Sequence, residues 1–220
     1  AANAYLGCWP IVRALEAGAD IVITGRCTDA AVVMGPAAWH HGWKPTDYDA
    51  LAGALVAGHI IECGCQATGG NYSFFEEVPS FHNVGFPIAE VHEDGSSVIT
   101  KHAHTGGLVS VGTVTAQLMY EIQTADYHCP DTIARLDSVT LEQEATDRVI
   151  VSSVKGRPPT DTLKVGINLT AGWRNRVRII LGSHHVDQKA AIVEDTFWPL
   201  VGGKDSFEEA RTDLFTQRAP

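Results

Sequence analysis

Residues 47–61 read DYDALAGALVAGHII, and this stretch predicts a tightly packed helix. Asp47 stands near its expected start, and small residues recur along it, so neighbouring elements can approach its backbone closely. A glycine-rich loop, GCQATGGN at residues 64–71, follows it. We therefore expect a helix that packs closely against its neighbours and meets a glycine-rich loop.

Upstream of this helix, the pattern predicts helix, strand and helix in succession. Residues 9–17 carry apolar side chains at helical spacing, with Gly18 as the C-terminal cap, and residues 20–24 form a short β-branched run. An alanine-rich run to residue 39 follows, in which Thr28 or Asp29 can serve as N-cap. The intervening loop then lies at a strand end and a helix N-terminus, where open α/β sheets bind ligands.

Downstream of the glycine loop, residues 87–92 and 98–101 flank an Asp-Gly pair, which predicts a β-hairpin. The triplet TGG at residues 105–107 precedes a predicted helix over residues 113–122. Short β-branched segments then alternate with turns, at residues 138–141, 148–154, 163–169 and 176–181. A final helix over residues 186–197 and a last strand near residues 211–215 complete the prediction.

These elements predict an α/β protein: a Rossmann-like layered α/β segment followed by an α+β subdomain with antiparallel strands. We place the domain boundary near residue 126, which gives an α/β part over residues 1–126 and a subdomain over residues 127–220. With 220 residues and 45% hydrophobic side chains, the chain can bury a substantial core.

The composition disfavours several classes of function. A net charge of −10 repels phosphate backbones and anionic lipid surfaces, so we expect no nucleic-acid and no membrane partner. Every apolar run falls short of the roughly 20 residues that cross a bilayer. Five cysteines, an odd number, argue against a disulfide framework, and no signal peptide is apparent. These features predict a cytoplasmic protein, and the missing initiator Met suggests a truncated reading frame.

A series of short motifs resembles the signature of the acyclic terpene utilisation (AtuA) family. In order, they are ANAYLG (2–7), TGRCTD (24–29), GH and ECG (58–59 and 62–64), TGG (68–70), FPIAEV (86–91), TGGLVS (105–110), QLMYEI (117–122), GRPP (156–159) and KV (164–165). The tail FEEAR at residues 207–211 is also similar. The resemblance implies a bacterial protein of terpenoid catabolism, and a fragment, because family members usually carry a glycine-rich N-terminal α/β portion ahead of the first motif.

The resemblance also implies a ligand class. The family is named after bacterial operons for acyclic terpenes such as citronellol and geraniol, whose intermediates are acyl-CoA thioesters handled by dehydrogenase, carboxylase and hydratase partners. Thr24, Gly25 and Arg26 offer a hydroxyl, backbone N–H groups and a planar cation that suit a carboxylate or phosphate. The alternative is that Arg26 pairs structurally with Asp29.

Two further loops supply candidate residues. In the first, Glu62 can act as a general base and Gln66 and Asn71 as amide donors around Gly69 and Gly70, although such a loop can also be a plain tight turn. It lacks a dinucleotide fingerprint and the lysine of a P-loop, so neither NAD nor ATP is predicted.

In the second loop, Lys101 precedes Thr105, Gly106 and Gly107 and can neutralise a thioester enolate, or it can be a solvated strand-end lysine. The neighbouring histidines are poorer candidates. Cys63-x-Cys65 lacks the spacing of a zinc knuckle, and buried free thiols are the simpler interpretation.

Two hypotheses for the function follow. The first is a cofactor-independent enzyme subunit, lyase- or hydratase-like, that acts on an acyl-CoA or related carboxylate and holds neither cofactor nor metal. The second is a non-catalytic ligand-binding or assembly subunit, and homo-oligomer formation is open in both. The predicted catalytic residues are Glu62 and Lys101, and the predicted substrate-binding residues are Asn3, Thr24, Gly25, Arg26, Asp29, Gln66, Gly69, Gly70, Asn71, Thr105, Gly106 and Gly107.

Overall fold

The computed structural model describes residues 1–182 and 184–215. The chain divides into two units, Ala1–Leu169 and Thr170–Pro220. Helices and antiparallel sheets are mixed in it, so the predicted α/β class is confirmed. No helix among these residues has the length and apolar character that a membrane span requires.

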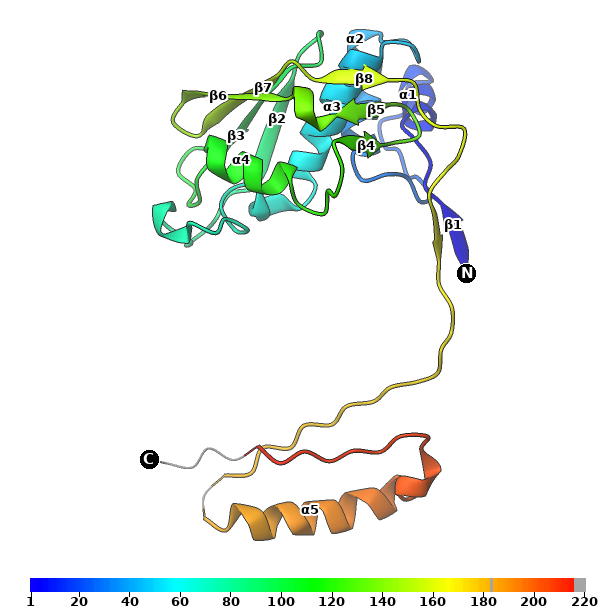
Figure 1. The fold of residues 1–220 in the computed structure, drawn as a ribbon, viewed down its shortest axis with the longest axis vertical. Coiled ribbons are helices and arrows are strands. Elements are labelled where there is room, and N and C mark those ends of the chain that lie inside the picture. Colours follow the sequence, from blue (N-terminus) through cyan, green and yellow to red (C-terminus); the bar gives the residue numbers. More distant parts are fainter. Residues whose placement is uncertain (183, 216–220) are drawn as a thin grey trace. The chain divides into compact units, whose positions relative to one another are not determined.

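Helix α3 (Tyr48–Ile61) is the core of the first unit (Figure 1). It begins after the N-cap residue Asp47, as predicted, and every residue from Leu51 to Ile60 is buried. Its small residues permit close packing: a Cβ at Gly53 would lie 2.0 Å from the carbonyl oxygen of Gly95, and one at Gly58 would lie 2.7 Å from the Ala30 side chain. The helix therefore has neighbours on all sides.

Helices α1 (Trp9–Glu16) and α2 (Ala31–His41) form a layer against α3, with α2 next to it. The strand predicted over residues 20–24 is wrong. Ile21 and Ile23 are 81% and 92% exposed, and no neighbouring strand pairs with them among the described residues. The predicted N-caps of α2 are also wrong, because the N-cap is Ala30, one residue after Asp29 and two after Thr28, and Thr28 instead accepts the Ala31 N–H through its backbone oxygen.

A four-stranded antiparallel sheet lies against α3, in the order β2 (Pro87–Val91), β3 (Ser97–Lys101), β7 (Arg148–Ser152) and β6 (Thr140–Ala145). The predicted hairpin is confirmed as β2–β3, with Pro87 opposite Lys101 and Val91 opposite Ser97. The turn contains Gly95, whose φ is +83°. The boundary predicted near residue 126 falls inside this first unit, because β7 pairs with β3.

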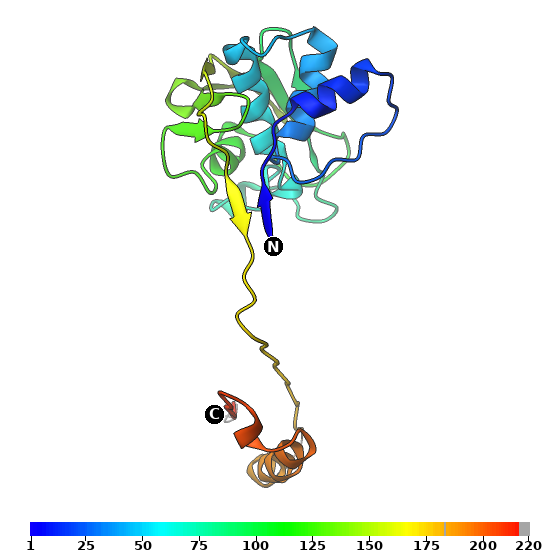
Figure 2. The ribbon, with the colours of Figure 1, turned by 90° about the vertical axis from the view of Figure 1, so that its right-hand side faces the viewer.

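Two smaller sheets complete the first unit. One has the order β4 (Asp126–His128), β5 (Ile133–Arg135) and β8 (Lys155–Arg157), and the other pairs β1 (Ala2–Ala4) with β9 (Val165–Ile167). Figure 2 shows β1 and β9 side by side. Helix α4 (Val111–Leu118) starts at a capping box of Ser110 and Thr113 and ends earlier than predicted. Short 3-10 turns occupy Gly64–Gln66, Phe75–Glu77, Leu136–Ser138 and Lys204–Ser206.

The second unit contains helix α5 (Val186–Leu200), which confirms the predicted final helix. The strands predicted at residues 176–181 and 211–215 are wrong, since neither segment pairs with another strand in the described part of the chain. Ile180 is 89% exposed and Phe215 is 91% exposed, so these apolar side chains gain no burial that would favour a strand.

Candidate functional site

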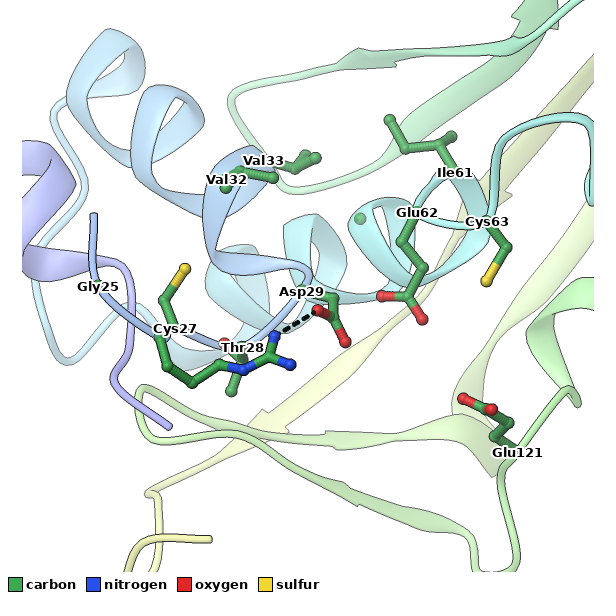
Figure 3. Close-up of a pocket in the computed structure, with 12 residues that line it drawn as sticks. Gly25, Cys27, Thr28, Asp29, Val32, Val33, Ile61, Glu62, Cys63 and Glu121 are labelled. Atoms are coloured by element: carbon green, nitrogen blue, oxygen red, sulfur yellow. Dashed lines mark hydrogen bonds and ion pairs between the residues drawn. The ribbon is translucent and has the colours of Figure 1, made fainter. Parts of the chain in front are cut away.

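A pocket of about 780 Å³ lies in the first unit (Figure 3). Its walls are the loop over residues 25–29, the first turn of α2, the last turn of α3 and the turn that follows α4. Figure 3 shows the side chains of Asp29, Glu62 and Glu121 turned toward this space from three different segments. The pocket is therefore acidic, with Arg26 as its cation among the lining residues.

Arg26 lies at one side of the pocket and pairs with Asp29. Its Nη1 is 3.4 Å from Asp29 Oδ1, and the two side chains are 48% and 62% exposed. Such a long, solvated pair contributes little energy, and the rest of the guanidinium can still donate hydrogen bonds. The structural pairing and the ligand-binding role of Arg26 are thus compatible.

Glu62 follows the last turn of α3 and is largely buried. Its side chain is 13% exposed, and Oε1 is 3.3 Å from Nδ1 of His59, one turn earlier on the same helix. The other carboxylate oxygen, Oε2, is buried with no hydrogen-bond partner among the described residues. The contact with His59 is within ion-pair distance, but the two groups are not aligned for a hydrogen bond. Glu62 thus lines the pocket while one of its carboxylate oxygens is buried without a partner among the described residues.

His59 is 2% exposed and is held by the backbone of α4's last turn. Its Nε2 lies 3.1 Å from the carbonyl oxygen of Leu118. Because a carbonyl only accepts, Nε2 carries the hydrogen that it donates to Leu118, and Nδ1 faces Glu62. This geometry places the imidazole directly behind the carboxylate.

Polar side chains surround the His59–Glu62 pair. The Tyr127 ring lies 5.0 Å from the His59 ring, and burial, followed by the charge of Glu62, raises the pKa of Tyr127, so its phenol stays protonated. Gln117 is fully buried on α4, and neither of its amide atoms has a partner in the described structure. Burial also raises the pKa of the pocket-lining Cys63 thiol, which makes it a poor nucleophile.

Four of the predicted site residues line the pocket together: Gly25, Arg26, Asp29 and Glu62. Thr24 lies beside them, with its hydroxyl 3.6 Å from Cys27 Sγ. Asn3 lies in β1, and Gln66 lies in the 3-10 turn after α3, where its buried Oε1 has no partner in the part of the chain that is described.

The remaining predicted glycines lie in two loops that pack against each other, outside the pocket lining. Leu108 N–H donates to the Thr68 carbonyl, and the N–H groups of Gly106 and Gly107 donate to the carbonyls of Asn83 and Ser80. A Cβ at Gly106 would meet a backbone oxygen at 2.3 Å. The neighbouring Gly69, Gly70, Asn71 and Thr105 belong to the same pair of loops, and binding roles for this group stay predictions.

Lys101 takes part in an internal ion pair. Its Nζ lies 3.0 Å from Asp147 Oδ2 and donates to the Thr105 carbonyl at 3.2 Å, and its side chain is only 6% exposed. The lysine is therefore buried and paired, which differs from the solvated lysine considered as the alternative. Its catalytic role stays a prediction, and it does not line the pocket.

Sequence reasoning missed His59, Tyr127 and Glu121. His59 could have been found from the sequence, because it is three residues before Glu62 and residues at this spacing are neighbours on a helix surface. Tyr127 and Glu121 come from segments after α4 and reach the site only through the tertiary fold. All five cysteines are free thiols, with Cys8 and Cys129 buried and Cys65 exposed, so the expectation of burial holds for only part of the set.

Asp131 supports the wall behind the pocket. It is 5% exposed, and its Oδ2 accepts the backbone N–H of Cys8 at 2.8 Å, at the start of α1. The Cys129 thiol lies 3.7 Å from the same oxygen and 3.5 Å from the hydroxyl of Thr28, which lines the pocket. The carboxylate thus ties α1 to the pocket loop.

We expect stability to depend on the protonation of Asp131. Burial raises the pKa of Asp131, so the folded state holds this proton more tightly than the unfolded state. This stabilisation is complete below the unfolded pKa of about 3.9 and is lost as pH rises through the raised folded pKa. Urea denaturation should therefore show that Asp131→Asn gains stability relative to the unsubstituted protein as pH rises from about 4.

The matched control is Asp137→Asn, because a hydrogen bond from Arg135 lowers the pKa of exposed Asp137. This substitution should lose stability relative to the unsubstituted protein as pH rises toward about 4, and the difference should change little above that pH, because a lowered folded pKa gives stabilisation that is complete above the unfolded pKa. Profiles with the same slope for both variants would contradict the assignment to Asp131.

Comparison with known proteins gives one match. The family model described as acyclic terpene utilisation family protein AtuA matches residues 1–220. No curated protein and no solved structure matches the chain.

Proposed function

This chain belongs to the acyclic terpene utilisation family AtuA, and from that premise we propose that it is an enzyme subunit acting on a branched acyl-CoA or a related carboxylate. The family implies a part in acyclic terpene utilisation. In the proposed reaction, Glu62 removes a proton from a carbon activated by the thioester carbonyl, and the electron pair moves toward the carbonyl oxygen to form an enolate. For lyase- or hydratase-like chemistry, the enolate then expels hydroxide from the next carbon, which leaves as water with the proton held by Glu62, and hydration is the reverse of these steps.

The observation that carries this proposal is the position of Glu62. Its carboxylate faces the pocket, one of its oxygens is buried and unpartnered, and the Nδ1 of His59 lies 3.3 Å from the other. A general base needs an acceptor oxygen within reach of the substrate and a neighbour that responds to its change of charge. His59 is the positioning residue in this arrangement, because the bond to Leu118 fixes its ring.

Other walls of the pocket suit the rest of such a substrate. Val32, Val33 and Ile61 provide apolar surface for a branched hydrocarbon chain. Arg26 provides the cation that attracts a carboxylate or another anionic group. An apolar wall, one cation and one buried carboxylate in a single pocket form a coherent set for an acyl substrate.

Substitution of Arg26 tests the anchoring role. Arg26→Gln is expected to weaken binding of a geranyl-CoA-type thioester by about three- to tenfold, because it removes a partly solvated charge contact worth roughly 1 kcal/mol. The turnover number should change little. Isothermal titration measures the affinity, and Arg13→Gln on exposed α1 is the matched control. Equal affinities for the Arg26 variant and the control would remove Arg26 from the site.

A non-catalytic ligand-binding or assembly subunit is the second candidate. It is favoured by Lys101, which is engaged with Asp147, and by the glycine loops, which lie outside the pocket lining. Under this alternative the protein binds the thioester, but substitution of Glu62 leaves the pathway's turnover unchanged. Parallel binding and turnover measurements on the same variants therefore separate the two functions.

A further inference from the structure

Tyr5 lies between two segments that each carry a cation. Its backbone N–H donates to the Lys164 carbonyl at 2.9 Å, and the next N–H, that of Leu6, donates to the Arg26 carbonyl at 3.3 Å. The Leu6 carbonyl in turn accepts the Thr28 N–H at 2.9 Å. Tyr5 is therefore hydrogen-bonded to the residue directly before β9, and Leu6 is hydrogen-bonded to the pocket loop. Both lie next to the paired strands β1 and β9 seen in Figure 2.

Both cations reach the same aromatic ring. The guanidinium carbon of Arg26 is 4.6 Å from the centroid of the Tyr5 ring, and the Lys164 Nζ is 4.9 Å from it. Both distances fall within the range of cation–π contacts, about 6 Å. The Tyr5 ring thus contacts two cationic side chains, one of which, Arg26, lines the pocket.

Of these two cations, only Arg26 has an ion-pair partner among the described residues. Arg26 has the long contact with Asp29 described above, and Lys164 forms no ion pair with any residue that the structure describes. The pocket lining holds three carboxylates, Asp29, Glu62 and Glu121, and Lys164 adds a second cation beside Arg26 through the Tyr5 ring. The two cations repel each other, and an anion that contacts both would add an attraction that outweighs this repulsion.

We propose that Tyr5, Arg26 and Lys164 form an anion-binding rim that takes a phosphate group. A phosphate carries three acceptor oxygens and up to two charges, which suits a planar guanidinium and an ammonium arriving from different segments. A lone carboxylate needs only Arg26. Inside the pocket, Glu62 and Glu121 repel a phosphate, so the rim holds it outside.

The phosphate has two candidate sources, the phosphorylated tail of a thioester or free phosphate. We assign the phosphate to the tail of the thioester, and this assignment rests on the proposed function. The acyl group would occupy the pocket and its carrier would extend over the rim. Binding of the thioester should then weaken as ionic strength rises, because its carrier makes exposed charge contacts with the rim.

The test uses Lys164→Gln, with Lys44→Gln as control because Lys44 is an exposed lysine of the same unit outside the pocket lining. Titration with geranyl-CoA should show about three- to fivefold weaker binding for Lys164→Gln, as expected for loss of one exposed charge contact. Binding of the geranyl thioester of pantetheine, which has no phosphate ester, should be unchanged. Lys164→Arg should retain the affinity for geranyl-CoA, and Lys44→Gln should bind both thioesters normally.

Inorganic pyrophosphate distinguishes the two sources. If geranyl-CoA displaces it in a Lys164-dependent manner, the rim binds the tail. Pyrophosphate binding that depends on Lys164 but survives saturating geranyl-CoA would assign the rim to free phosphate and overturn the inference, as would equal effects of Lys164→Gln on the two thioesters. Failure of the proposed function is a separate result, because it appears in the turnover of Glu62 variants and leaves these affinities untouched.

Discussion

Changing Glu62 to Gln is expected to lower the turnover number for a branched acyl thioester by about 10²- to 10⁴-fold, the range found when a general base is removed. The amide has nearly the same shape as the carboxylate, but it does not accept the proton. Affinity for the thioester should change by less than about threefold, since Arg26 and the apolar wall provide the binding contacts. Mass spectrometry of substrate consumption measures the rate, and titration measures the affinity.

Glu121→Gln is the matched control for this result. Glu121 lines the same pocket, but it is exposed and has no histidine partner in the described structure. We expect turnover within about threefold of that of the unsubstituted protein, because a solvated carboxylate contributes little to positioning. Equal losses for the two variants would mean that the general acidity of the pocket, rather than Glu62, supports the reaction.

His59 offers a second check on the same carboxylate. His59→Gln retains a side-chain amide that can donate to the Leu118 carbonyl, but it removes the imidazole nitrogen that lies 3.3 Å from Glu62 Oε1. The pH profile of turnover should therefore change shape as well as height. A loss of activity with an unaltered pH profile would indicate that His59 is a packing residue only.

Gly95→Ala is expected to lower the free energy of unfolding by about 2–5 kcal/mol. Two effects add together: the residue has φ of +83°, which disfavours a side chain by about 1–2 kcal/mol, and a Cβ would lie 2.6 Å from the Ala50 Cα of α3. Forcing the hairpin away from a buried helix typically costs about 1–3 kcal/mol. Chemical denaturation measures the loss.

Gly42→Ala is the control, because Gly42 also has a positive φ, +69°, but a Cβ there meets nothing within 4 Å. Its free energy of unfolding should fall by about 1–2 kcal/mol, because only the backbone conformation disfavours the side chain. The additional loss in free energy of unfolding for Gly95→Ala then measures the cost of a side chain where the hairpin approaches the helix. Equal losses would show that this contact contributes nothing to stability.

The helices and the hairpin were predictable because their signals are local. The small residues of α3 allow close packing that the structure uses at Gly53 and Gly58, and the Asp-Gly pair predicts the β2–β3 turn. The strand at residues 20–24 was mispredicted because β-branched composition favours a strand only where a partner strand and a buried face exist. Ile21 and Ile23 have neither among the described elements.

The candidate site was predictable in part for the same reason. Arg26, Asp29 and Glu62 lie next to helix ends that the sequence indicates, and the fold brings them into one pocket. Lys101 looked equally suitable, but Asp147, from the turn between β6 and β7, pairs with it across the fold. Pairing of this kind depends on tertiary structure, and neither residue signals it.

In the proposed function, Glu62 exchanges a proton with the carbon skeleton of an acyl thioester. The most direct measurement is deuterium incorporation into geranyl-CoA in D₂O, followed by mass spectrometry, with the unsubstituted protein and Glu62→Gln in parallel. We predict incorporation at a carbon activated by the thioester carbonyl with the unsubstituted protein, and about 10²-fold slower incorporation with the variant. Equal incorporation by both proteins, or none by the unsubstituted protein, would contradict the claim.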